Sequence, residues 1–171
     1  MNRISLLRDQ FKQAHEWLEA TVGDVIAEDA HAIPPGVANP IGATYAHAVL
    51  AEDGVINGML KGAAPMFAGD WSGKTGVSEP QMNQTLEWGR KVKVDLPALR
   101  QYAQAVYKNT DDYLAGLKDS DLDRIIDLTS AGLGKQSVAW VMSNVVLGHV
   151  HNMMGEISAL KGIQSKKGYP F

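Results

Sequence analysis

The chain has 171 residues, 45% of them hydrophobic and 20% charged, which are the proportions of an ordinary soluble globular protein. A net charge of −3 without a basic stripe argues against a nucleic-acid-binding protein. The length fits one hydrophobic core, so we expect a single domain over residues 1–171.

Neither a membrane anchor nor a disulfide framework is indicated. No run of about 18 apolar residues is present, and the first residues lack the apolar core and cleavage site of a signal peptide. The chain contains no cysteine, which excludes disulfides, a thiol nucleophile and thiolate metal ligands. We therefore expect a cytoplasmic protein that binds neither membranes nor nucleic acid.

The first predicted helix covers residues 4–27. Its apolar residues recur every three to five positions, which is a helical stripe: Leu6, Phe11, Ala14, Leu18, Val22 and Val25. His15 lies beside this stripe, where a packing or helix-surface role is favoured over a role in a pocket.

A second helix is predicted after a proline-rich connection. Asn39-Pro40 is a start signal, with Asn39 as the N-cap and Pro40 as the first helical residue, and the helix runs to about residue 60. The face around His47 is small and mostly apolar, so another helix can approach it closely. Glu52-Asp53 follows, and two interpretations stay open: an exposed acidic pair, or carboxylates that support a site from behind.

Residues 61–78 form a long glycine-rich connection of the kind that often covers a site. Its apolar residues Met66, Phe67 and Trp71 either form a lid or tie the connection to the body, and the second interpretation is favoured. A shorter helix is predicted over residues 79–92. Asp95 and Pro97 then mark the start of a third long helix that ends near residue 117.

The last part of the chain contains a short extended segment and a long helix. Residues 124–129 read as a strand, followed by a turn and either a second extended piece or the last helix. Ser137 is the predicted cap of that helix, which covers residues 138–162. The aromatic ending Tyr169-Pro170-Phe171 is expected to pack back on the body.

One face of the last helix carries the candidate site. At about 100° per residue, His149, Met153 and Glu156 share a face, whereas His151 points to nearly the opposite side. Gly148 and Gly155 offer a shallow surface to a neighbouring helix. We therefore expect this helix to pack on the second one, with His47 and His149 near the contact.

These segments resemble the DinB-like superfamily over essentially the whole chain. The likeness rests on Tyr45-Ala46-His47 with Glu52-Asp53 behind it, on the run from His149 to Ile157, and on the closing Gly168-Tyr169-Pro170-Phe171. The resemblance implies an all-α, up-down-type four-helix bundle, often dimeric, with a three-histidine site for Zn²⁺ or Ni²⁺. Some members are thiol-dependent transferases or isomerases, and many have no assigned activity.

This chain departs from the family pattern at the third ligand. His47 and His149 match the first two histidines, but the third falls on Met153, whose soft thioether suits Cu(I) better than Zn²⁺ or Ni²⁺. Three interpretations follow: weak metal binding by the two histidines and water with help from Glu156, loss of the metal, or substitution by His151 through a distorted helix.

Two functions therefore compete. The first is a metal-dependent hydrolase or transferase with a degenerate site, in which His47 and His149 are ligands and Glu52 or Glu156 supports them or acts as a base. The second is a non-catalytic bundle that binds a small ligand or a partner subunit. A homodimer is expected in either case. Serine-hydrolase and phosphate-loop motifs are missing from the sequence.

Overall fold

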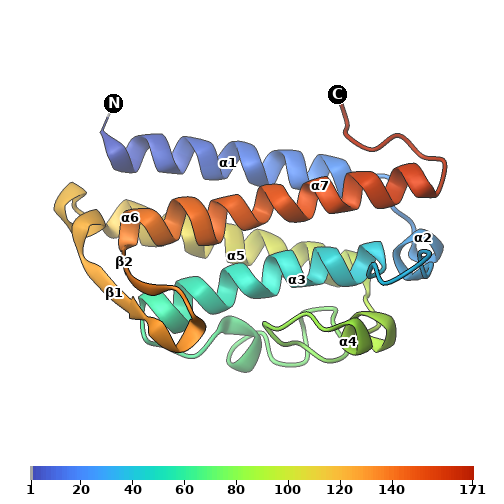
Figure 1. Cartoon of the computed structure of the whole chain (residues 1–171), viewed down its shortest axis with the longest axis horizontal. Coiled ribbons are helices and arrows are strands. Elements are labelled where there is room, and N and C mark those ends of the chain that lie inside the picture. The colour runs from blue at the N-terminus through green and yellow to red at the C-terminus, as the bar shows by residue number, and fades with distance from the viewer. Residues whose placement is uncertain (1) are drawn as a thin grey trace.

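The computed structural model describes residues 2–171, which are mostly helical with one small sheet. Four long helical segments lie side by side (Figure 1): α1 (Arg3–Val22), α3 (Ile41–Asp53) with the π-helix η1 (Gly54–Leu60), α5 (Leu96–Gly116), and α6 (Val138–Trp140) with the π-helix η5 (Val141–Leu147) and α7 (Gly148–Ile163). The shorter elements are α2 (Ala27–His31), η2 (Met66–Ala68), α4 (Leu86–Lys91), η3 (Asp119–Asp123), β1 (Ile125–Leu128), η4 (Thr129–Ala131) and β2 (Gly134–Ser137).

The long helices enclose one hydrophobic core. Each contributes fully buried aliphatic side chains, for example Leu18 of α1, Leu50 of α3, Leu99 of α5 and Ile157 of α7. Burying one such side chain contributes about 1.5–3 kcal/mol relative to leaving it in water. The apolar residues predicted for the stripe of the first helix are therefore buried in this core, except Leu6, which is exposed.

The helix directions differ from strict up-down alternation. Asp53 contacts Tyr102 and, further along both segments, Lys61 contacts Asn109, so α3 and α5 run in the same direction. Figure 1 shows α1 and α7 running the other way. The cause is the long connection between η1 and α5, which returns along the molecule before α5 begins.

Two of the predicted helix starts are confirmed by their capping bonds. The Asp95 side chain accepts a hydrogen bond from the N–H of Ala98, and Ser137 accepts one from Trp140. Asn39 was expected to cap α3 but does not, since α3 begins after Pro40 without a side-chain cap.

The fourth helix is shorter than the predicted span of residues 79–92. It covers Leu86–Lys91, and its cap is Thr85, whose hydroxyl accepts from the N–H of Trp88. Asn39 packs beside Gly89 of this helix, where a Cβ atom would come within 2.1 Å of the Asn39 Oδ1 atom. The glycine therefore permits a close approach of the chain segment that leads into α3.

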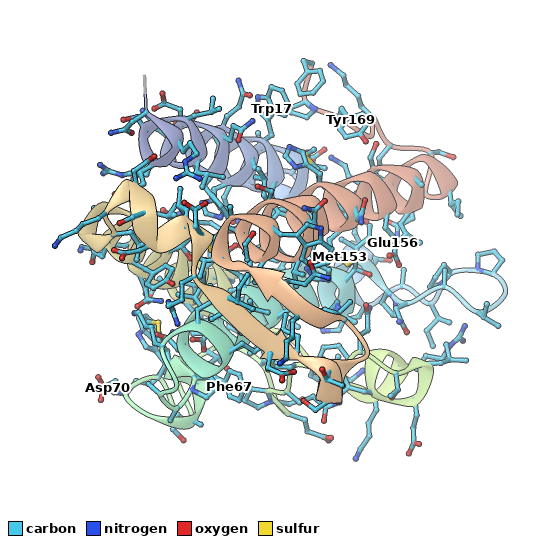
Figure 2. All side chains as sticks on the ribbon, turned by 60° about the vertical axis from the view of Figure 1, so that its left-hand side comes forward. Trp17, Phe67, Asp70, Met153, Glu156 and Tyr169 are labelled. Atoms are coloured by element: carbon cyan, nitrogen blue, oxygen red, sulfur yellow. The ribbon has the colours of Figure 1, made fainter. Side chains whose placement is uncertain are left out.

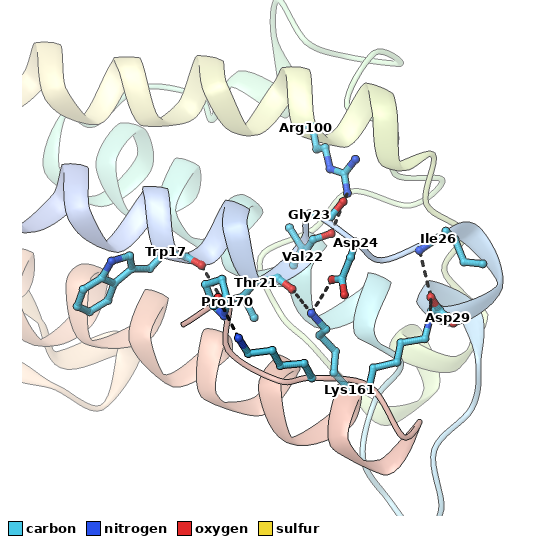
Figure 3. Close-up of polar contacts among 12 residues, drawn as sticks. Trp17, Thr21, Val22, Gly23, Asp24, Ile26, Asp29, Arg100, Lys161 and Pro170 are labelled. Atoms are coloured by element: carbon cyan, nitrogen blue, oxygen red, sulfur yellow. Dashed lines mark hydrogen bonds and ion pairs between the residues drawn. The ribbon is translucent and has the colours of Figure 1, made fainter.

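Two basic side chains bind the carboxyl end of α1, which stops at Val22 rather than near residue 27 (Figure 3). Lys161 of α7 is 2% exposed and donates to the Thr21 carbonyl at 2.8 Å and to Asp24 at 2.5 Å. Arg100 of α5 donates to the Val22 carbonyl at 2.8 Å. Carbonyls at a helix end lack intrahelical partners and carry partial negative charge, so both cations are well placed.

Asp53 ties the glycine-rich connection of residues 61–78 to the body. Its carboxylate is fully buried and accepts four hydrogen bonds of 2.5–3.1 Å, from the side chains of Asn57 and Tyr102 and from the backbone N–H groups of Met66 and Phe67. The Trp71 ring also lies 5.5 Å from that of Tyr102. The connection is thus anchored to α3 and α5, and the exposed-pair interpretation is wrong for Asp53.

The end of the chain folds back as predicted. The Phe171 ring lies 5.3 Å from that of Trp17 on α1 and stacks on Tyr169, and Figure 2 shows Trp17 and Tyr169 on the same side of the molecule. The predicted strand is present as β1, which pairs antiparallel with β2. No helix within residues 2–171 is long and apolar enough to cross a membrane.

Replacing Asp53 by alanine is expected to lower the free energy of unfolding by about 3 kcal/mol or more, because several buried donors lose their acceptor. Urea denaturation followed by circular dichroism measures this loss. The matched control is Asp112→Ala, which removes an exposed carboxylate paired with Lys108 and should leave stability nearly unchanged. Equal stability of the two variants would contradict the anchoring role.

Candidate functional site

His47 of α3 and His149 of α7 converge on one point. Their Nε2 atoms are 3.0 Å apart, and their rings meet edge to face with centroids 4.7 Å apart and an interplanar angle of 87°. Both side chains are partly buried. The two residues are far apart in the sequence, and their proximity agrees with the contact expected from the helical faces.

Gly148 and Gly155, which were predicted to lie at this contact, do not lie against α3. A Cβ at Gly155 would meet the Tyr169 hydroxyl at 3.5 Å, and one at Gly148 would meet only the Ser143 carbonyl of the same helical segment. Neither position faces α3. Small residues of α3, such as Ala43 and Ala46, are almost fully buried.

Burial keeps both imidazoles neutral at neutral pH. Desolvation and the neighbouring His149 lower the pKa of His47 to about 4, against an ordinary value of 6.5. Desolvation also lowers the pKa of His149, while the charge of Glu52 opposes that change. The Met82 backbone lies near enough to His47 to oppose its shift, yet the buried His47 Nδ1 makes no hydrogen bond of ordinary geometry.

The other candidate residues on α7, which are Met153, Glu156 and His151, differ in their burial and in their partners. Figure 2 shows Met153 and Glu156 on α7; Met153 packs against the apolar core, and Glu156 is partly buried, with its Oε1 atom 3.5 Å from the Thr44 hydroxyl. His151 is exposed, and its Nδ1 atom bonds to the Leu147 carbonyl of its own helical segment at 3.0 Å. The interpretation with His151 as a replacement ligand is therefore not supported.

Glu52 is buried rather than exposed, and its partners were not predicted. It is 2% exposed, accepts from the Thr110 hydroxyl at 2.5 Å, and lies 3.0 Å from the Nε2 atom of His15. The His15 ring stacks on Tyr107 with centroids 3.8 Å apart. His15 therefore has the packing role that was favoured for it, whereas its contact with Glu52 was not predicted.

A small cavity lies between Glu52 and His149. It has a volume of about 70 Å³ and is lined by Ala51, Glu52, Val55, Val145, Val146 and His149. Since one water needs about 10–15 Å³ of such volume, a few water molecules fit between the carboxylate and the imidazole. The cavity therefore has the room and the polar groups that a hydrated reaction or binding site requires.

Both π-helical segments contribute to the wall of this cavity. Val55 belongs to η1, and Val145 and Val146 belong to η5. A π-helix inserts extra backbone into a turn and is frequent at functional sites. The regular helical arithmetic used for the sequence could not reveal these segments, although it holds within α7, where His149, Met153 and Glu156 lie.

The histidine pair fits two ligand positions of a tetrahedral metal. With metal–nitrogen bonds of about 2.0–2.1 Å and a tetrahedral angle, two nitrogens lie about 3.3 Å apart. The observed 3.0 Å separation is short of that value by a few tenths of an ångström, and both rings are neutral, as ligands must be. However, no three His, Asp, Glu or Cys residues within residues 2–171 are grouped to hold a metal ion.

Comparison with known proteins matches residues 10–155 to the family model described as the DinB superfamily. One similar solved structure is the crystal structure of the conserved protein of locus from Enterococcus faecalis, with 20% sequence identity and a TM-score of 0.80. The match covers 95% of this chain and 97% of that chain, and at this identity it concerns the fold alone. No curated protein matches the chain.

The pKa of His47 predicts how metal-free protein responds to acid. As the pH falls from 6.5 towards 4, the unfolded chain binds a proton at this residue while the folded chain does not, so stability is lost over that window. Urea midpoints measured in EDTA at several pH values should decline less steeply for His47→Gln than for the parent. His151→Gln, which changes an exposed ring, should follow the parent. Equal slopes for the parent and His47→Gln would contradict the depressed pKa.

Proposed function

The chain belongs to the DinB superfamily, and on this premise we propose that it is a four-helix bundle whose His47–His149 pair binds a divalent cation such as Zn²⁺ or Ni²⁺ weakly. The single observation that carries the proposal is the convergence of two neutral imidazoles through Nε2 at 3.0 Å. The adjoining cavity leaves space for water in the remaining coordination positions.

Weak binding follows from the residue at the third position. Met153 lies one turn after His149, where the family pattern has a histidine, and a thioether is a poor ligand for Zn²⁺ or Ni²⁺. With two protein nitrogens and water as ligands, the site binds the cation more weakly than a three-histidine site does. The buried Glu52 and the partly buried Glu156 are the carboxylates available to orient water or substrate.

The chemistry that fits such a site is that of a metal-dependent hydrolase or transferase. A bound cation with an open position acts as a Lewis acid and lowers the pKa of bound water. In this proposal, His47 and His149 hold the cation, and Glu52 accepts or returns a proton across the cavity that it shares with His149. The aliphatic lining from η1 and η5 limits the amount of water around the site.

A second candidate function is a non-catalytic bundle that binds a small ligand or a partner in the same region. The observation that favours it is the direct hydrogen bond between the two histidines, which satisfies both Nε2 atoms without any metal. The two functions differ in what they predict for added metal.

We also propose that the protein is a cytoplasmic homodimer. The absence of cysteine agrees with a cytoplasmic location, since exported proteins often contain disulfides. Support for the dimer comes from large apolar side chains that remain exposed on the monomer: Leu6, Ile26, Ile33, Val37, Ile125, Ile163 and Phe171.

Metal binding is tested by titrating tag-free protein with Zn²⁺ and with Ni²⁺ in calorimetry. We expect saturable binding near one ion per chain, loss of binding in His149→Ala, and binding about tenfold tighter or more in Met153→His, because that variant restores the third nitrogen. His151→Ala is the matched control and should bind like the parent, since its ring is exposed and faces away.

The variants separate the two candidate functions. A parent that binds neither ion, together with a Met153→His variant that binds, would mean that the bundle keeps the geometry but has lost the metal. If neither protein binds, the proposed ligand pair is wrong.

The oligomeric state is measured separately by light scattering. We expect a dimer mass at micromolar concentration, about twice the 18.5 kDa of one chain. A mass of one chain would contradict the proposed homodimer without affecting the metal site.

A further inference from the structure

A groove lies between α1 and α5. Its volume is about 860 Å³, and all of its lining residues belong to these two helices. Small-molecule sites typically measure about 300–1,000 Å³. Neither His47 nor His149 lines the groove, so it is separate from the candidate metal site.

The floor of this groove is aromatic. Phe11, His15 and Tyr107 are 3%, 7% and 8% exposed and line the groove side by side. The His15 and Tyr107 rings stack with an interplanar angle of 15°, and the Phe11 ring lies 5.7 Å from His15. Because the His15 Nε2 atom is bound to Glu52 and its ring is held by Tyr107, the floor is rigid rather than adaptable.

A carboxylate without a basic partner lies in the same groove. Glu19 Oε1 accepts hydrogen bonds from the hydroxyls of Tyr45 at 2.7 Å and Tyr107 at 2.8 Å. Burial and the charge of Glu19 raise the pKa of both phenols, so they remain donors. Within residues 2–171, no Lys, Arg or His lies within 4.0 Å of the Glu19 carboxylate.

The other charges of the groove do not cancel that of Glu19. Arg8 pairs with Asp111 at 2.6 Å, and Lys12 lies 4.0 Å from Glu16. Lys108 also lines the groove, and it is bound at 2.5 Å to Asp112, which does not line it. The exposed Asp9 adds a further negative charge. A ligand that reaches Glu19 therefore meets a negative group above a π surface.

We infer that this groove binds a small organic cation, an ammonium or amidinium compound whose apolar body lies on the Phe11–His15–Tyr107 floor. The cationic group pairs with the carboxylate of Glu19, and the aromatic floor beside that carboxylate contacts the rest of the ligand. A carboxylate or phosphate ligand is disfavoured because it would face Glu19 and Asp9. The inference goes beyond the proposed metal site and does not depend on it.

The experiment compares two ligands of nearly the same shape on the parent protein in EDTA. Benzylammonium carries the charge, whereas benzyl alcohol is neutral, and ¹H–¹⁵N chemical shifts report where each one binds. We expect saturable shifts on α1 and α5 with benzylammonium, and binding of benzyl alcohol that is weaker by about tenfold. Because this comparison uses the parent chain, it does not depend on the folding of any variant.

A pair of charge-neutralising variants locates the cation. Glu19→Gln keeps an oxygen for the tyrosine hydroxyls but removes the charge, and should weaken benzylammonium binding by about tenfold without changing benzyl alcohol binding. The control is Glu16→Gln, which makes the same change of net charge at the exposed rim and should bind like the parent.

Three results would overturn the inference. They are equal binding of the two ligands, no saturable binding of benzylammonium at millimolar concentration, and shifts that map outside α1 and α5. Equal effects of the two variants on benzylammonium binding would also overturn it. Such a result would show that the ligand responds to the net negative charge of the protein and not to Glu19.

Discussion

Two adjacent buried carboxylates at the end of α3 hold the structure together. Glu52 binds His15 of α1 and Thr110 of α5, while Asp53 binds Tyr102 of α5 and the backbone of the glycine-rich connection. A charged group without partners in a protein interior is strongly unfavourable, so each carboxylate requires its donors in place. Correct folding therefore requires α1, α5 and the connection to meet α3 at one level along its axis.

That requirement also sets the position of the candidate metal site. His47 lies on the same helix as Glu52, and the cavity beside His149 is bounded by Glu52 on one side and by both π-helical segments on another. The groove between α1 and α5 reaches the same carboxylate through His15. Glu52 thus lies between two hollows of different chemistry: a cavity lined by the imidazole of His149, and a groove with an aromatic floor and the carboxylate of Glu19.

The presence of the long helices was predictable because their signals are local, although α1 ends at Val22 rather than near residue 27. Caps such as Asp95 and Ser137 and the apolar periodicity act within a few residues, and helical arithmetic together with the family resemblance was enough to bring His47 opposite His149. The missed features depend on distant residues. Glu52 looks like a surface acid until Thr110 is placed beside it, and regular helical spacing does not reveal the π-helical segments η1 and η5.

The shared direction of α3 and α5 shapes how the chain reaches this structure. Antiparallel helices need only a short turn, whereas here residues 61–95 must return along the molecule before α5 can dock. The entropy cost of closing a loop grows with its length. Asp53 captures Met66 and Phe67 only 13 and 14 residues later, so the first part of the return path can form with α3 as a local unit. The contacts between α1 and α5 and between α3 and α7 join residues about a hundred positions apart in the sequence. Contacts of such long sequence separation slow folding.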